Sequence, residues 1–527
     1  MASKKQGFLL YGSIAVVVTV ALGLSSFMSI GNGERFKAIM LFIAFAMLLC
    51  GVMIARLGLP EKYIFYAILA AGVAMRVGYA IYTFADVRQH DVWEFEGDPG
   101  HFYYINELYE NGRLPDSYGG QYYHGPLSHA MIALFLRLVS LTGIDPTNAG
   151  ESWLQVVPCI LSCFTIVLVY RTAAELKLGE RVCLTATALT AFHPTFYILA
   201  GSINNDMAMT FFFFLGILYT VRYFNRPTMK HILILAVAIG CSMMSKLSGG
   251  MIALFTGPVF LVVLVVCIRQ SKIKRVLTQT AGDKNDADEE NGTNDKSGTD
   301  EGNNVNNKTQ LTLKKLIAQF AAFLAVCAPL GLWHSIRNLV VLGQPLGYVP
   351  SPPLDSDLYV GWFSLKERFL SFSLSQYFGS WCNPREDYNL WAYLLKCALF
   401  GEWEFDVPRL LADSFLLLFL ILTLISVGCM VCCLRKKDVH PILRYGLLLL
   451  TAVQLLMYLN FNIGYPFGCT MDFRYVVPLV LPFSVFSALA AEWADQGSKR
   501  WKKGAAAVIY TVIGGFCTLS VLIYVIL

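Results

Sequence analysis

Residues 85–137 read ADVRQHDVWEFEGDPGHFYYINELYENGRLPDSYGGQYYHGPLSHAMIALFLR and form the one long polar and aromatic segment of an otherwise apolar chain. Its early positions carry five acids against the single base Arg88, namely Asp86, Asp91, Glu94, Glu96 and Asp98. Acids this close repel one another, so some would have raised pKa values or share a cation. The simpler alternative is a loop whose acids face water. Either way, the segment predicts a polar loop carried on an apolar scaffold.

The composition places that scaffold in a membrane. Of 527 residues, 56% are hydrophobic and 15% are charged, and the mean hydropathy is +0.54. A soluble domain is usually about 25% charged and lacks apolar runs near 20 residues. The runs here are continuous rather than alternating, which excludes a β-barrel. We therefore predict an all-α polytopic membrane protein.

The apolar runs predict about thirteen membrane spans with juxtamembrane helices at the outer face. We expect these spans at residues 7–30, 36–57, 62–84, 152–174, 182–199, 207–224, 231–248, 249–268, 316–333, 409–433, 440–460, 473–492 and 505–527. Short basic clusters fall in every second loop, which places the N-terminus inside and the C-terminus outside. We expect the helix 126–141 to lie on the membrane surface, because reading it as a short span would invert all that follows.

The same runs divide the chain. Residues 1–61 hold two spans outside the core, 62–268 hold the core with an outer loop at 85–151, and 316–527 hold a C-terminal membrane region with an outer loop at 334–408. Between them, residues 269–315 include a tract with no aromatic side chain, which predicts a disordered inner loop.

Two short motifs in the outer loop carry a resemblance to a known family. Residues 98–104 read DPGHFYY and residues 123–127 read YHGPL. This order resembles the first outer loop of polyprenyl-phosphate-sugar-dependent glycosyltransferases of the GT-C type. The nearest pattern is glycosyltransferase family 39 in the broad sense, the protein O-mannosyltransferase and aminoarabinose transferase group. Pro99 replaces the second acid of the family's pair and Gly125 replaces a Pro, so Asp98 and Asp91 both remain candidates for the catalytic acid.

Four further positions follow the family's order on the same predicted face. Asp206 follows an Asn pair, although an acid there could equally cap a helix. Lys246 stands among small residues, with interfacial snorkelling as the alternative. Arg337-Asn338 and Arg474-Tyr475 supply guanidinium groups, which bind phosphate bidentately. Arg474 could otherwise serve as a membrane anchor.

The resemblance implies a glycosyltransferase that moves a hexose or a pentose from a polyprenyl-phosphate donor to an acceptor hydroxyl at the outer face, with inversion. The implied catalytic residues are Asp98 or Asp91, with Asp206. The implied substrate-binding residues are His101, Tyr104, His124, Lys246, Arg337, Asn338, Arg474 and Tyr475. The site could also contain a divalent cation bound by Asp98 and Asp206.

The expected surroundings are a lipid bilayer, most simply the plasma membrane, and a lipid-linked sugar. The sequence identifies neither the sugar nor the acceptor, and it contains no nucleic-acid-binding pattern. Two rival hypotheses stay open, a transporter or flippase and a non-catalytic binder of lipid-linked saccharides. A transporter predicts internal repeats or charges at mid-membrane, and we find no convincing repeat.

Overall fold

The computed structural model describes residues 4–27, 61–83, 87–95, 97–146, 153–288, 311–371, 388–403 and 407–526. Within these residues, nine helices are long and apolar enough to cross a membrane, or ten when the bent pair α7 and α8 counts as one span. The predicted all-α polytopic class is therefore confirmed. The predicted second span lies outside the described residues, so the total of thirteen stays a prediction.

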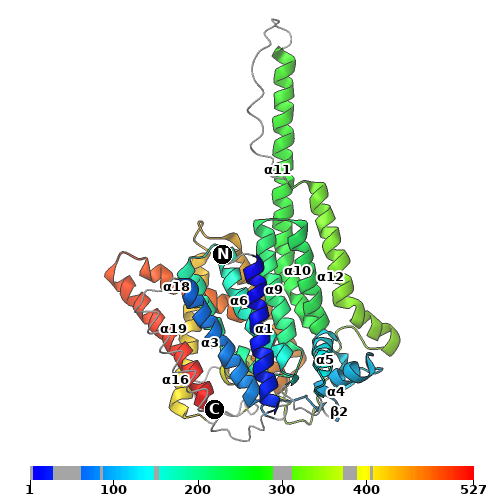
Figure 1. Ribbon diagram of the computed structural model, residues 1–527. Coiled ribbons are helices and arrows are strands. Elements are labelled where there is room, and N and C mark those ends of the chain that lie inside the picture. Colours follow the sequence, from blue (N-terminus) through cyan, green and yellow to red (C-terminus); the bar gives the residue numbers. More distant parts are fainter. Residues whose placement is uncertain are drawn as a thin grey trace.

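The main helices run side by side in one bundle (Figure 1). They are α1 (Lys4–Phe27), α3 (Glu61–Tyr82), α6 (Val156–Glu175), α7 (Glu180–Ala191), α8 (Pro194–Gly201), α9 (Asp206–Asn225), α10 (Met229–Ser245), α11 (Ala253–Asp288), α12 (Leu313–Leu342), α16 (Arg409–Cys433), α17 (Leu447–Gly464), α18 (Val480–Asp495) and α19 (Arg500–Ile526). The shorter elements are β1 (Glu94–Phe95), β2 (Asp98–Pro99), α4 (His101–Asn106), η1 (Glu107–Asn111), η2 (Gly120–Tyr123), α5 (Leu127–Ser140), η4 (Leu247–Ile252), α13 (Leu365–Phe369), α15 (Leu390–Phe400), η6 (Ile442–Gly446), η7 (Gly468–Met471), η8 (Phe473–Tyr475) and η9 (Val477–Leu479).

Burial separates the centre of the bundle from its lipid-facing rim. In the most apolar stretch of α6 and of α18, 72% of the residues are buried, against 22% in α12. All three helices are strongly apolar, so their composition alone does not say which one is central. A helix in a membrane keeps its apolar side chains exposed wherever it faces lipid, and α12 does so.

A break between α7 and α8 shapes the half of the bundle nearest the polar site. Pro194 has no N–H and leaves carbonyl groups of the preceding turn without their helical partner. Arg76, fully buried on α3, supplies donors to that turn. Its Nη1 donates to the Ala191 carbonyl at 2.7 Å and its Nε donates to Ser162 Oγ at 3.0 Å. The broken helix is thus fixed to α3 and α6.

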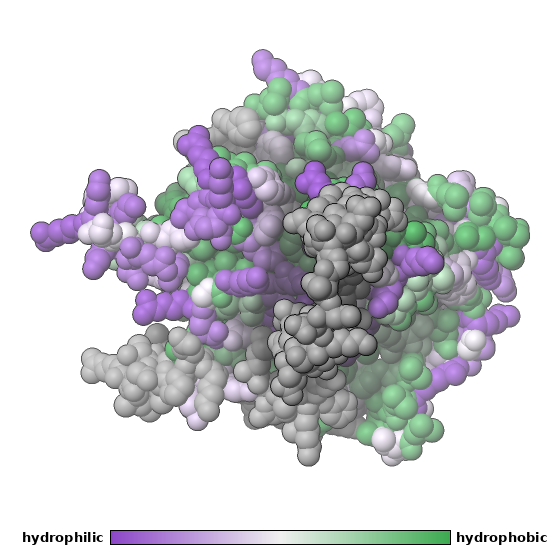
Figure 2. Space-filling view, turned by 90° about the horizontal axis from the view of Figure 1, so that it is seen from above, coloured by the Kyte–Doolittle hydropathy of each residue, from purple (hydrophilic) through white to green (hydrophobic). Residues whose placement is uncertain are grey.

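The polar elements and the start of the chain lie at opposite ends of the bundle. Figure 1 shows α4, α5 and β2 together at one end, while α1 begins at the other, where α11 extends away from the bundle. Viewed from the end where α1 begins, Figure 2 shows hydrophilic side chains gathered on the left, and hydrophobic patches interspersed with further hydrophilic side chains toward the top and the right. The loop between α6 and α7 at this end carries Lys177, and the loop between α9 and α10 carries Arg226.

Several boundaries differ from the predicted ones. α11 continues to Asp288, twenty residues beyond the predicted end of its span at 268. Residues 289–310 lie outside the described part, so disorder there stays a prediction, as does the division into domains. α12 extends to Leu342, into the predicted outer loop 334–408. α5 falls where the surface helix is predicted, with His129 buried on its inner face.

Candidate active site

The loop after α3 is fixed to two helix ends, and this places the side chains that follow. Arg88 Nη2 donates to the Phe400 carbonyl at the end of α15, at 2.6 Å. Gln89 Nε2 donates to the Gly201 carbonyl at the end of α8, at 2.9 Å. Arg88 and Asp91 both adopt left-handed backbone conformations, with φ of 56° and 59°. Such conformations are costly for residues other than Gly and cluster at functional sites.

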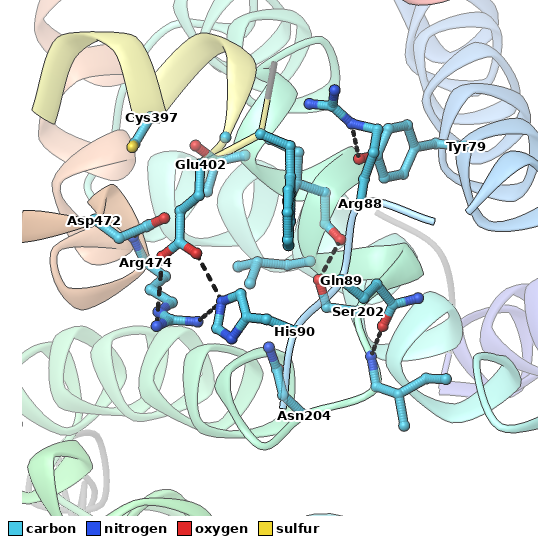
Figure 3. A pocket seen from close by; sticks show the side chains of 16 residues that line it. Tyr79, Arg88, Gln89, His90, Ser202, Asn204, Cys397, Glu402, Asp472 and Arg474 are labelled. Atoms are coloured by element: carbon cyan, nitrogen blue, oxygen red, sulfur yellow. Dashed lines mark hydrogen bonds and ion pairs between the residues drawn. The ribbon is translucent and has the colours of Figure 1, made fainter. Parts of the chain in front are cut away.

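This loop meets four other segments in a group of charged side chains that we call the polar cluster. Its members are His90, Asp91, Asp206, Lys246, Glu402, Asp472 and Arg474. Figure 3 shows His90, Glu402 and Arg474 pointing toward one another, with Asp472 beside Arg474. Acids from separate loops thus lie together with one arginine, Arg474.

His90 is the centre of the outer half of the polar cluster. Its Nδ1 lies 2.7 Å from Asp91 Oδ2 and its Nε2 lies 2.7 Å from Glu402 Oε2. Burial alone would lower the pKa of His90, but Glu402 and Asp91 raise that pKa to about 10. His90 is therefore protonated at neutral pH and donates a hydrogen bond to each carboxylate. Its Nε2 also lies 3.0 Å from Arg474 Nη1, and Arg474 Nη2 forms an ion pair with Glu402 Oε1 at 3.5 Å.

The two buried acids beside Arg474 have opposite protonation states. Burial would raise the pKa of Glu402, but His90 and Arg474 hold that pKa well below its usual range. Burial and the charge of Glu402 raise the pKa of Asp472 to about 8. Asp472 is therefore mostly protonated at neutral pH and shares a hydrogen bond with Glu402. The Asp472 carboxyl also accepts a hydrogen bond from the Arg474 backbone at 2.5 Å.

The inner half of the polar cluster is an ion pair between α9 and the end of α10. Asp206 is 2% exposed, and its Oδ1 lies 2.6 Å from Lys246 Nζ. Its Oδ2 lies 4.0 Å from Arg474 Nε, which has no hydrogen-bond partner among the described residues. Asn205, rather than Asp206, stands at the N-cap of α9. Tyr475 covers this pair, with Lys246 Nζ 4.7 Å from its ring centre.

A largely apolar cavity of about 620 Å³ begins at the polar cluster and runs between α10, η4, α12 and α17. Lys246, Tyr475 and His124 line its polar end. Met251 and Phe461 are among the apolar side chains that line the rest of it. A long apolar chain with a charged head group would match this division.

Other predicted site residues lie away from the polar cluster. Asp98 is exposed at the end of the β1–β2 hairpin and packs against Gly119 and Gly120. Within the described residues, no hydrogen bond or ion pair joins Asp98 to Asp91 or to Asp206. Of the two acids left open by the motif, the structure thus brings only Asp91 into the polar cluster.

Arg337 and Asn338 also lie outside the polar cluster, on α12. Arg337 Nη1 donates to the Pro115 carbonyl at 3.1 Å and to Asn338 Oδ1 at 2.9 Å. Asn338 Nδ2 in turn donates to Gln344 Oε1 at 2.8 Å. These contacts hold the outer loop against α12, so both side chains already form hydrogen bonds within the protein. Their predicted part in substrate binding stays a prediction.

Three more predicted residues form a buried aromatic layer behind the cavity. His101 Nδ1 lies 2.9 Å from His129 Nε2, and the Tyr104 hydroxyl donates to the His124 carbonyl at 3.2 Å. Burial, with the neighbouring imidazoles, lowers the pKa of His101 far below its usual value. Burial, with the charge of Lys246, does the same to the pKa of His124. These imidazoles are neutral at physiological pH, and His124 alone of the predicted three lines the cavity.

Sequence patterns alone assign no role to His90, Glu402 or Asp472. Glu402 follows the short apolar helix α15 in the run GEWEFD, and acids beside an apolar helix at a membrane surface are a signal that could have found it. His90 directly precedes Asp91 and Asp472 lies two residues before Arg474, so both could be found only as neighbours of predicted residues.

The predicted divalent cation does not fit these residues. Asp206 is already engaged by Lys246, and Asp98 lies apart on an exposed hairpin. In the described part of the chain, no group of three His, Cys, Asp or Glu side chains could hold a metal ion. Lys246 and Arg474 supply the positive charge that an ion would bring.

Comparison with known proteins places the chain beside membrane glycosyltransferases. Residues 80–280 match the family described as dolichyl-phosphate-mannose-protein mannosyltransferase. This match confirms the predicted resemblance, and the matched range includes Asp91, Asp206 and Lys246. No curated protein sequence matches the chain.

Among solved structures, the chain is similar to the oligosaccharyltransferase of Archaeoglobus fulgidus. The form tethered to an acceptor peptide containing the NVT sequon matches with 14% identity over 88% of this chain and 55% of that chain, with a TM-score of 0.47. The apo form matches with 13% identity over 88% of this chain and 56% of that chain, with a TM-score of 0.44. The form with Zn and sulfate matches with 14% identity over 87% and 53%, with a TM-score of 0.42. The match thus spans about half the length of these structures.

Proposed function

We propose that the chain is a membrane glycosyltransferase that moves one monosaccharide from a polyprenyl-phosphate donor to an acceptor hydroxyl, with inversion. This proposal rests on one observation, namely that a largely apolar cavity and the polar cluster meet at the same residue. A largely apolar cavity of about 620 Å³ ends at Lys246, and Lys246 belongs to a cluster that also contains the carboxylate of Asp91.

The donor is proposed to bind with its lipid chain in the cavity and its phosphate at Lys246 and Arg474. The apolar walls suit an isoprenoid chain, and the two cations suit a phosphate diester. Arg474 Nε lacks a hydrogen-bond partner within the described residues and lies beside the ion pair. A guanidinium is a strong donor to phosphate oxygens. The sugar would then lie over the polar cluster.

Asp91 is proposed as the general base. It is partly exposed, and His90 holds its Oδ2, so its other oxygen remains available to an acceptor hydroxyl. The hydroxyl proton passes to Asp91 as the acceptor oxygen attacks the anomeric carbon, and the bond from that carbon to the phosphate oxygen breaks. A single displacement of this kind inverts the anomeric centre.

The phosphate leaves as a monoester with one additional negative charge. Preorganised cations stabilise such developing charge strongly, and removing one donor typically costs about 10²–10³ in rate. Arg474 is held in place by Glu402, at 3.5 Å between Nη2 and Oε1, and by its backbone contact to Asp472. His90, Glu402 and Asp472 are thus positioning residues for Asp91 and Arg474.

The site is proposed to face outward from the plasma membrane, with the N-terminus in the cytoplasm. Basic loops between α6 and α7 and between α9 and α10 share the end where α1 begins, and the polar cluster lies toward the other end. Positive loops normally remain on the cytoplasmic side. The charges of the polar cluster lie beside helix ends rather than at mid-membrane, which favours transfer over transport.

The proposal is tested with the full chain in detergent and a panel of polyprenyl-phosphate hexoses and pentoses. Release of polyprenyl phosphate, followed by mass spectrometry in the presence of membrane extract as acceptor, is the expected result. Arg474→Ala should lower the rate at least about a hundredfold. Arg409→Ala, which removes an exposed arginine at the start of α16, is the matched control and should not. Equal rates for both variants would contradict the proposed site.

A further inference from the structure

A second cavity, of about 560 Å³, lies between α15, α16, α17 and α18. Its walls are almost entirely apolar, and none of the described residues that line it is Asp, Glu, Lys or Arg. Val427 lines it and is 46% exposed on α16, so the cavity reaches the lipid-facing surface. The first cavity differs, because Lys246 lies at its polar end.

One polar side chain in this second cavity is unusual. His193, at the break between α7 and α8, is fully buried and lines the cavity. Neither of its ring nitrogens has a hydrogen-bond partner among the described residues. Its ring stacks on Phe473 at 5.7 Å between centres and meets Phe419 and Phe483 edge-on at 5.6 Å and 6.0 Å. Buried polar groups are normally paired, so this imidazole calls for a partner.

We propose that the second cavity binds a neutral lipid with a single hydroxyl group, and that this hydroxyl bonds to His193. A neutral imidazole offers one donor and one acceptor, and a hydroxyl group matches both. The absence of charged side chains among the described lining residues disfavours a phosphate head group, because a buried charge needs a partner. The aliphatic and aromatic walls take the hydrocarbon chain.

The bound lipid would lie directly against the segment that carries the proposed transfer site. Phe473, which stacks on His193, stands between Asp472 and Arg474 in sequence. Phe473 therefore links the lipid site, which it lines, to the two polar-cluster residues beside it in sequence. Binding at the lipid site is nevertheless a property of His193 and the helices α15, α16, α17 and α18, and it holds whether or not the chain transfers sugar.

The test compares two photoreactive probes on the wild-type full chain in detergent. One is a diazirine-bearing long-chain alcohol, and the other is the same hydrocarbon without its hydroxyl group. We expect the alcohol to label peptides of α16 and α18 with an affinity about tenfold higher, as one or two hydrogen bonds would give. Equal labelling by the two probes would overturn the proposal and leave a site for any hydrocarbon chain.

Two variants locate the hydroxyl contact. His193→Phe should abolish the preference for the alcohol while keeping the aromatic shape of the site. Thr423→Val is the matched control in the same cavity, because the Thr423 hydroxyl already donates to the Phe419 carbonyl at 2.8 Å. This control should keep the preference within about twofold. If His193→Phe keeps the preference as well, the assignment to His193 is wrong.

Discussion

The replacement of Asp91 by Asn tests the proposed mechanism most sharply. Asn keeps the shape of the side chain but cannot take the proton of an acceptor hydroxyl. A positioned general base typically contributes about 10²–10⁴ in rate, which corresponds to about 2.7–5.4 kcal/mol in the activation free energy. We expect Asp91→Asn to lower kcat by that factor.

The same substitution should leave the fold nearly intact. Asp91 and His90 form a partly buried ion pair whose side chains are 21% and 22% exposed, and the amide oxygen of Asn can still accept the hydrogen bond from His90. His90 keeps its second partner, the buried carboxylate of Glu402. Donor binding should also persist, because Lys246 and Arg474 are unchanged. The variant should therefore bind the donor and fail to transfer its sugar.

Asp98→Asn is the control, because Asp98 stands closest to the family motif yet is exposed on the β1–β2 hairpin. We expect its transfer rate to stay within about twofold of the wild type, as is usual for surface substitutions. The assay measures kcat for release of polyprenyl phosphate at saturating donor, with donor binding measured separately by native mass spectrometry. A hundredfold loss in Asp98→Asn with a normal rate in Asp91→Asn would refute the reasoning.

Further expectations concern stability, pH and metal ions. Lys246→Met leaves Asp206 buried without its partner and should lower the free energy of unfolding by about 3 kcal/mol, the low end for a broken buried pair because Arg474 is near. Adding Asp206→Asn should restore most of that loss in denaturant titrations, and full stability of Lys246→Met alone would contradict the pairing. Asp472 holds a proton up to about pH 8 in the folded chain but only to about pH 3.9 when unfolded, so stability should fall as pH rises through this window. Tm measured from pH 5 to 9 should fall less in Asp472→Asn, and identical curves would count against a protonated Asp472. Transfer should persist in excess EDTA, and its loss with rescue by Mg²⁺ or Mn²⁺ would show that an ion is required after all.

The membrane architecture could be predicted because apolar run length directly reports a span. The burial of each helix could not be predicted from the sequence, because α12 and α18 are both apolar but differ in how many of their residues are buried. The break at Pro194 has a local signal in the proline itself. Arg76 stands out as a charge within an apolar span, but its partner cannot be read from the sequence, because the two meet only after α3 packs against α7.

Three members of the polar cluster could be picked out from the sequence, because each is a charged residue at the end of an apolar run. Asp206, Lys246 and Arg474 each stand beside an apolar run, where a charge needs a reason. Asp98 matched the family motif, but the hairpin at Gly97, with φ of 82°, turns the chain so that Asp98 faces outward. Glu402 belongs to a distant segment, and the packing of α15 against α8 and η8 brings it to the polar cluster.

The central claim is that the lipid-linked donor lies in the cavity between α10, α12 and α17, with its phosphate at Lys246 and Arg474. A structure of the full chain with a bound polyprenyl-phosphate monosaccharide measures this directly. We predict that a phosphate oxygen lies within hydrogen-bond distance of Lys246 Nζ or the Arg474 guanidinium and that the sugar faces Asp91. A phosphate bound instead at Arg337, or a lipid chain outside this cavity, would contradict the account.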